Sequence, residues 1–218
     1  MGRTADSPLD VYDHISAAYD LIADPAEHGV RERGLALLDA QPGERVLDLG
    51  AGTGSALPLL AARVGELGLV CGLDASAGML ARAQQRVAGG RIALQRGDAR
   101  RLPYLQEAFD AAFMSFTLEL FEPPDISAVL SELRRVLKRR GRLVVVSLNL
   151  PAEPSLAVSA YRWLHGRFPH WIDCRPIRVS SLLGQAGYRT TRSEELTLWG
   201  LPILAVVAFP RGIATQSA

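Results

Sequence analysis

The sequence predicts an α/β fold: a doubly wound sheet of seven strands, mostly parallel, with an antiparallel last strand. Two observations carry this prediction. Short apolar strands alternate with helical patterns over residues 45–148, and such alternation is typical of parallel βαβ units. No helical pattern separates the last two apolar runs, 188–198 and 203–209, so we expect them to pair as an antiparallel hairpin.

The composition fits one globular domain. The chain has 218 residues, of which 48% are hydrophobic and 22% are charged. A net charge of +1 creates no strong field, so we expect no nucleic-acid partner. No apolar run approaches the ~20 residues of a membrane-spanning helix, and the polar N-terminus does not resemble a signal peptide. Two cysteines, Cys71 and Cys174, form no disulfide or metal framework, which favours a cytoplasmic location.

The organising feature is a glycine-rich turn between a first strand, 45–49, and a helical segment, 56–62. Gly50, Gly52 and Gly54 occupy alternate positions in it. Glycine permits φ > 0 and lets a ligand approach the backbone closely. The N–H groups at the start of the following helix favour an anionic group. The turn therefore predicts a nucleotide-type site.

The spacing of the glycines separates two kinds of nucleotide site. A dinucleotide fingerprint, G-x-G-x-x-G, would place its third glycine where Ser55 or Leu57 stands. The observed pattern is instead an acid, Asp48, followed by glycines at every second position. This disfavours a nicotinamide-dependent oxidoreductase. The structural alternative is a plain glycine-rich turn of an α/β protein.

Acidic residues follow the next two strands. Asp74 ends strand 69–74, and in a doubly wound sheet it would lie beside the glycine turn and accept both hydroxyls of a ribose. Asp74 could instead cap the next helix, for which Ser76 is the other candidate cap. Met79 either lies against an adenine face or packs in the core. Asp98 follows a third strand and either binds the ligand or fixes a turn.

A fourth strand, 108–116, leads to a predicted helix over 126–140 and a fifth strand over 143–148. Basic residues gather where we expect this helix to end. They either form a patch for lipid headgroups at a membrane surface or a solvated helix end that suits the helix dipole. These residues are Arg134, Arg135, Lys138, Arg139 and Arg140.

Together, these features resemble the class I methyltransferases that use S-adenosylmethionine (SAM), which implies a Rossmann-like fold with SAM as cofactor. The resemblance covers nearly the whole chain. It rests on the segment Val46–Gly54, Asp74, the loop Gly97-Asp98-Ala99, and Phe109-Asp110 at the start of the fourth strand. Tyr19-Asp20 and the run Arg134-Arg135-Val136-Leu137-Lys138 with Gly141 resemble the UbiE-like group of ubiquinone and menaquinone biosynthesis.

The resemblance implies a set of cofactor-binding residues, with the methionine end of SAM at the glycine turn, its ribose at Asp74 and its adenine amino group at Asp98. The set is Tyr19, Asp48, Gly50, Gly52, Gly54, Asp74, Ala75, Met79, Asp98, Ala99 and Ser115. One departure concerns the methyl acceptor. Quinone enzymes of this group have a Phe-Gly-x-Arg-Asn type sequence after the fourth strand, and here Glu119 stands where the arginine would be.

The chain divides into four expected parts within a single domain. Residues 1–42 form a helical lid, with Tyr19 folded over the cofactor or, alternatively, packed on the sheet edge. Residues 43–149 form the SAM-binding core. Residues 150–178 form a cap over the strand ends, and residues 179–210 form a closing helix and hairpin.

The cap and the segment after the fourth strand supply the expected walls of an apolar pocket for the methyl acceptor. Alternatively, the aromatic residues of the cap pack it onto the domain or mediate a dimer. The acceptor-binding candidates are Phe116, Phe121, Tyr161, Trp163, His165 and His170.

We therefore expect a SAM-dependent methyltransferase acting on a small hydrophobic acceptor, aromatic or quinone-like. No spacing typical of metal ligands or of a Ser/His/Asp triad occurs. Glu119 is the candidate catalytic base, followed by His165 and His170, for which a helix end and a loop hydrogen bond are the alternatives. The remaining alternative function is a SAM-binding protein without catalysis.

Overall fold

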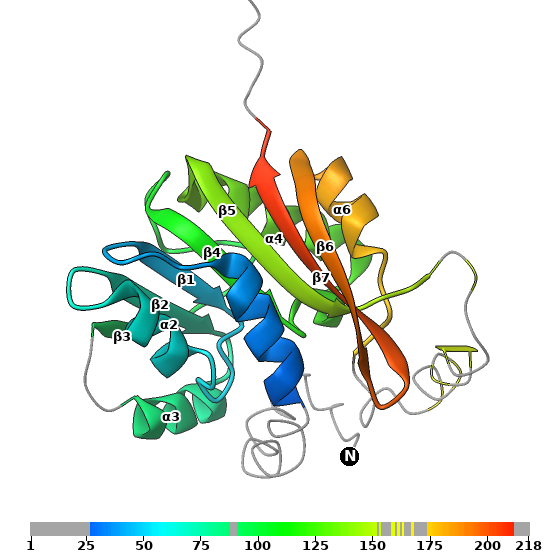
Figure 1. Ribbon diagram of the computed structural model, residues 1–218, viewed down its shortest axis with the longest axis horizontal. Helices are drawn as coiled ribbons and strands as arrows, with labels where there is room; N and C mark the ends of the chain where they lie inside the picture. The colour runs from blue at the N-terminus through cyan, green and yellow to red at the C-terminus, as the bar shows by residue number, and fades with distance from the viewer. Residues whose placement is uncertain are drawn as a thin grey trace, which may run out of the picture.

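The computed structural model describes residues 27–87, 91–151, 153, 158, 159, 161, 163, 167 and 174–211. Within them, seven strands form one sheet in the order β3-β2-β1-β4-β5-β7-β6 (Figure 1). The predicted lid helix before residue 24 and most of the predicted cap lie outside the described residues. No helix in the described part of the chain is long and apolar enough to cross a membrane.

The predicted hairpin at the end of the chain is confirmed. Strands β1 to β5 pair in parallel, whereas β7 runs antiparallel to both β5 and β6. β6 therefore runs in the direction of β5, and the sheet has six parallel strands and one reversed strand. The strands are β1 Arg45–Leu49, β2 Leu69–Asp74, β3 Ile92–Arg96, β4 Phe109–Ser115, β5 Leu137–Leu148, β6 Tyr188–Leu198 and β7 Leu201–Pro210.

Helices cover both faces of this sheet, as the doubly wound prediction requires (Figure 1). The helix over residues 27–38, together with α2 and α3, packs on one face, and α4 and α6 pack on the other. Gly34 lets the first of these helices approach closely, because a Cβ there would lie 2.4 Å from Val146. The labelled helices are α2 Leu57–Val64, α3 Ala77–Arg86, α4 Pro123–Val136 and α6 Val179–Gln185, and η1 Leu118–Leu120 is a 3-10 turn.

The predicted boundary between the fourth helix and the fifth strand is wrong. α4 begins at Pro123 and ends at Val136, and β5 begins at once with Leu137, which pairs with Phe109 of β4. The chain is extended here because hydrogen bonds to the neighbouring strand replace those of another helical turn. The pairing shifts register between Phe109 and Ala111, which marks an irregularity at this end of the strand.

The basic residues after position 137 consequently lie in a strand, so the helix-end interpretation does not hold for them. Lys138 forms an ion pair of 2.6 Å with Asp110. Arg142 forms one of 2.7 Å with Glu44. Lys138 thereby links the start of β5 to β4, and Arg142 links the middle of β5 to the residue before β1, while Arg139 remains exposed.

Candidate functional site

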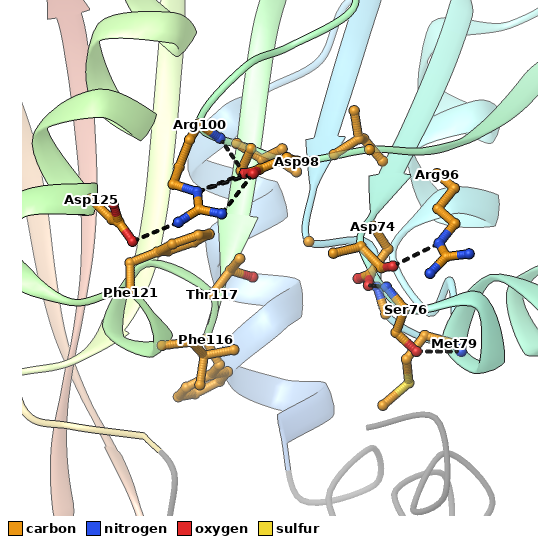
Figure 2. Close-up of a pocket in the computed structure, with 18 of the residues that line it drawn as sticks. Asp74, Ser76, Met79, Arg96, Asp98, Arg100, Phe116, Thr117, Phe121 and Asp125 are labelled. Carbon is orange, nitrogen blue, oxygen red and sulfur yellow. Dashed lines mark hydrogen bonds and ion pairs between the residues drawn. The ribbon is translucent and has the colours of Figure 1, made fainter. Parts of the chain in front are cut away.

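The carboxyl ends of the parallel strands open into a cavity of about 690 Å³ (Figure 2). Ligands of doubly wound proteins bind at this edge of the sheet. The cavity joins the loops after β1, β2 and β3 to the segment after β4. Its lining residues include Gly50, Gly52, Asp74, Ala75, Met79, Asp98, Ala99, Arg100, Ser115, Phe116, Thr117, Leu120, Phe121 and Asp125.

Two of the three glycines in the turn are needed for close packing, and the third borders the cavity. All three have positive φ, at 73°, 54° and 82°. A Cβ on Gly50 would lie 2.3 Å from Thr117, and one on Gly54 would lie 2.9 Å from the Cβ of Ala83 in α3. A Cβ on Gly52 would meet nothing within 4 Å. Gly50 and Gly54 thus serve packing, while the backbone of Gly52 borders the open cavity and fits the close approach of a ligand.

Asp74 connects the glycine turn to the start of α3. Its Oδ2 accepts the backbone N–H of Gly52 at 2.8 Å, and its Oδ1 accepts that of Ser76 at 2.9 Å. The cap of α3 is Ser76, whose hydroxyl accepts the N–H of Met79 at 3.1 Å. A carboxylate has about four acceptor positions, so Asp74 can hold the turn and still accept hydroxyl groups of a ligand.

Asp98 lies at the cavity in a network with a basic neighbour. Its carboxylate accepts the backbone N–H of Arg100 at 2.8 Å and the guanidinium of Arg100 at 2.8 and 3.0 Å. Arg100 also donates to Asp125 of α4 at 2.9 Å, and so bridges two walls of the cavity (Figure 2). The Arg100 guanidinium lowers the pKa of Asp98 below its ordinary value. Asp98 therefore fixes its own turn, and it is ionised beside the cavity.

Asp48 is buried behind the turn and does not line the cavity. It lies on the face of β1 that carries Val46, toward the helix over residues 27–38, because side chains alternate along a strand. Its Oδ2 has no hydrogen-bond partner among the described residues. Burial raises its pKa to about 7, against the opposing charge of Arg31 and with a small contribution from Asp74.

Glu119 is also buried, on the far side of the segment that forms the cavity wall. It is 2% exposed, and it is absent from the described lining of the cavity. Its Oε1 accepts the backbone N–H of Leu148 at the end of β5, at 3.0 Å. Its Oε2 has no hydrogen-bond partner in the described part of the chain. Burial raises the pKa of Glu119 to about 7, and the hydrogen bond from Leu148 opposes this rise.

The segment after β4 forms an apolar wall that contains two of the residues expected from the sequence. Phe116 and Phe121 both line the cavity, with Leu120 between them. Phe116 has a φ of 50°, a left-handed conformation that is uncommon for a bulky residue. Ser115 lines the cavity at the end of β4, and its hydroxyl has no partner among the described residues.

The expected residues of the cap are not found at the cavity where they are described. The hydroxyl of Tyr161 donates to the carbonyl of Cys174 at 3.0 Å, and its ring packs against the core. Trp163 is 67% exposed. Neither residue is part of the cavity lining. Tyr19, His165 and His170 lie outside the described residues.

Sequence reasoning missed Arg100 and Arg175. Arg175 donates to the carbonyl of Phe121 at 2.7 Å and lies 3.5 Å from the carboxylate of Glu122. Arg100 stands two residues after Asp98, and that spacing could have suggested the pair. No pattern along the chain connects Arg175 to a segment more than fifty residues earlier.

Comparison with known proteins agrees with this geometry. Residues 46–141 match a methyltransferase domain family. The chain is 37% identical over 154 residues to a 2-phytyl-1,4-naphtoquinone methyltransferase of Synechococcus elongatus, covering 67% of this chain and 65% of that protein. It is 34% identical over 213 residues to a demethylmenaquinone methyltransferase of Beutenbergia cavernae, covering 86% of this chain and 85% of that protein. The match thus spans slightly less than two thirds of the length of the first of these relatives.

The fold has a matching neighbour among solved structures. A SAM-dependent methyltransferase from Aquifex aeolicus superposes with a TM-score of 0.65 and 23% identity, covering 94% of this chain and 98% of that one. Fold, glycine turn and sequence relatives point in one direction: the chain belongs to the SAM-dependent methyltransferases, in the UbiE-like group that contains the demethylmenaquinone methyltransferases.

Proposed function

We propose that this protein transfers the methyl group of SAM to a carbon or oxygen atom of a small hydrophobic acceptor with an aromatic or quinone-like ring. One observation carries the proposal. A single cavity joins the glycine turn and Asp74 to an apolar wall that contains Phe116 and Phe121. The names of the relatives, which act on naphthoquinones and demethylmenaquinone, support the class of acceptor.

The cofactor end of the cavity fits SAM. The backbone of Gly52 borders open space where a Cβ would otherwise stand, and Asp74 is placed to accept the ribose hydroxyls. Asp98 and Ala99 would hold the adenine, with Met79 against its face, and Ser115 would meet the reactive end. Asp48, Gly50 and Gly54 would support the turn from behind, and Tyr19 would close over it from the lid.

When bound, SAM supplies an electrophilic methyl group on a sulfonium. The task of the protein is then to hold the acceptor ring at near-attack distance, and orientation of this kind can contribute about 7–11 kcal/mol to lowering the barrier. The apolar side chains of the wall position a flat ring and exclude water from it. A net charge of +1 provides no strong field to attract nucleic acid, so we propose a small-molecule acceptor.

The four successive parts of the chain would have different roles. Residues 1–42 would act as lid, 43–149 as SAM-binding core, 150–178 as cap and 179–210 as closing helix and hairpin. Of the expected cap residues, His165 and His170 would complete the substrate wall, whereas Tyr161 and Trp163 are not part of the cavity lining. A long-chain quinone resides in a membrane, so we place the protein in the cytoplasm with peripheral contact to the membrane surface.

Methyl transfer from labelled SAM tests the proposal. The purified protein is offered a prenylated hydroquinone, the same ring without its prenyl chain, and a polar amine. We expect label on the prenylated ring, less on the bare ring and none on the amine. Tight binding of SAM without label on any acceptor would instead favour a SAM-binding protein without catalysis, and binding of NAD in preference to SAM would favour an oxidoreductase.

A further inference from the structure

The apolar wall of the cavity is a short irregular segment, residues 116–122, between β4 and α4. Its only regular element is the 3-10 turn η1, three residues long. A segment with so few internal hydrogen bonds does not hold its own shape, so contacts with other elements must fix it. The structure provides such contacts at two points, through Glu119 and Arg175.

Glu119 supplies a hydrogen-bond acceptor at the point where β4 leaves the sheet. Ser115 is the last β4 residue paired with β5, and the N–H of Phe116 still donates to the carbonyl of Val146 at 2.9 Å. The chain then turns away from β5. The next N–H on this edge of β5, that of Leu148, therefore has no β4 carbonyl to bind. The carboxylate of Glu119 accepts this N–H at 3.0 Å. Without this carboxylate the buried N–H would have no hydrogen-bond partner, which destabilises the folded state.

Arg175 holds the other end of the same segment. Its guanidinium donates to the carbonyl of Phe121 at 2.7 Å and lies 3.5 Å from Glu122. The side chain of Arg175 is 30% exposed, so the contact is partly shielded from water. Glu119 and Arg175 therefore bracket Leu120 and Phe121, two residues of the wall that face the cavity.

We infer that Glu119 and Arg175 are positioning residues for the methyl acceptor, and that Glu119 acts through the wall rather than as a catalytic base. This inference rests on the proposed function. Glu119 needs only an acceptor oxygen for this task, because its partner is a backbone N–H. A base at this position would need to touch the substrate, and Glu119 lies behind the wall instead.

The charges around Glu119 agree with this role. Glu27 of the helix over residues 27–38 repels its carboxylate, and on the β5 side it faces the hydroxyl of Ser147 and the N–H of Leu148. Burial, together with the charge of Glu27, raises the pKa of Glu119 to about 7, whereas the N–H of Leu148 and the hydroxyl of Ser147 oppose this rise. The carboxyl group can thus accept the Leu148 N–H in either protonation state.

The conservative substitution Glu119→Gln separates positioning from base catalysis. A glutamine keeps the acceptor oxygen, so we expect kcat/KM for the prenylated hydroquinone within about threefold of wild type. Glu119→Ala and Arg175→Ala should raise the KM for the hydroquinone about tenfold, the equivalent of one hydrogen bond, with the Kd for S-adenosylhomocysteine unchanged. Glu107→Gln and Arg178→Ala, both at exposed positions outside the cavity lining, are the matched controls.

A loss of kcat of a hundredfold or more in Glu119→Gln, with unchanged KM, would establish a base and overturn the inference. Hydrogen exchange gives a readout that needs no turnover. The amide of Leu148 should exchange faster in Glu119→Ala and at the wild-type rate in Glu119→Gln. If the wild type methylates no acceptor, the proposed function fails, while the exchange result still decides whether Glu119 holds the wall. Unchanged exchange in a folded Glu119→Ala would overturn the inference on its own.

Discussion

The carboxylate of Asp74, at the end of β2, accepts the backbone N–H of Gly52 at 2.8 Å. This bond joins the second strand to the turn after the first. The residue expected to bind the ribose is therefore also a residue that shapes the glycine turn. We therefore expect affinity for the cofactor and order in the turn to depend on the same side chain.

Asp74→Ala should weaken binding of S-adenosylhomocysteine by about 1.5–3 kcal/mol for each charge-assisted hydrogen bond that it removes. The loss of binding free energy has two sources: the missing hydrogen bonds to the ribose and the reduced order of the glycine turn. Titration calorimetry measures it. Asp74→Asn keeps one acceptor oxygen and should fall between wild type and Asp74→Ala. Equal affinity in all three proteins would contradict the assignment of the ribose site.

Gly52→Ala should abolish cofactor binding while the protein stays folded. The new Cβ would enter the open cavity, and φ of 54° adds a strain of about 1–2 kcal/mol. Gly43→Ala is a matched control, because Gly43 has φ of 84°, has no atom within 4 Å of its Cβ position and stands before β1, outside the cavity lining. Both variants should lose similar stability in chemical denaturation. Only Gly52→Ala should lose binding in calorimetry.

The stability of the protein should fall as pH rises toward neutrality. Burial raises the pKa of Asp48 and of Glu119 to about 7, from ordinary values of 3.8 and 4.5. The folded protein thus retains protons that the unfolded chain releases. The stability that these protons contribute is complete below about pH 4 and is lost as pH rises through 7, by an amount on the order of 3 kcal/mol per carboxyl group.

Urea denaturation between pH 5 and 8 measures this dependence. Glu119→Gln cannot titrate, so its free energy of unfolding should fall less steeply with pH than that of wild type, and it should gain relative stability above pH 7. Asp48→Asn should behave in the same way. A wild-type free energy of unfolding that rises between pH 5 and 8 would show that neither carboxyl group is protonated in the folded state.

Arg100→Ala should change cofactor binding more than stability. The bridge from Asp98 to Asp125 is an exposed surface network, so solvent and salt screen its contribution to stability. Its removal frees the loop that carries Asp98, so we expect the Kd for S-adenosylhomocysteine to rise severalfold and the melting temperature to change little. Calorimetry at low and at high salt measures the effect. Arg101→Ala, at the exposed next residue outside the cavity lining, serves as control.

Local sequence patterns predicted several elements of the fold, including the strands that lead to the proposed cofactor site. The bounds of β1 and β2, the cap at Ser76 and the reversed last strand are as the sequence predicted. Each depends on residues close together in the chain, namely an apolar run, a cap or a missing helical period. Such signals act locally, so they can be recognised without knowledge of the tertiary structure.

The remaining features depend on contacts between distant segments. The run after Val136 has helix-forming residues, yet it pairs with β4, and no local pattern reports that pairing. The direction of the Glu119 side chain follows from where β4 ends relative to β5. Both outcomes are tertiary effects that override local propensity.

The place of β7 between β5 and β6 has a consequence for synthesis on the ribosome. Strand β5, whose residues Val144–Val146 are fully buried, has one edge that is covered by β7, residues 201–210, in the described part of the chain. Until that last strand has been translated, the nascent chain presents an uncovered apolar edge, which is a template for aggregation. The order of translation thus leaves completion of the sheet to its final strand, and ribosome stalling before residue 201 should expose the chain to chaperones.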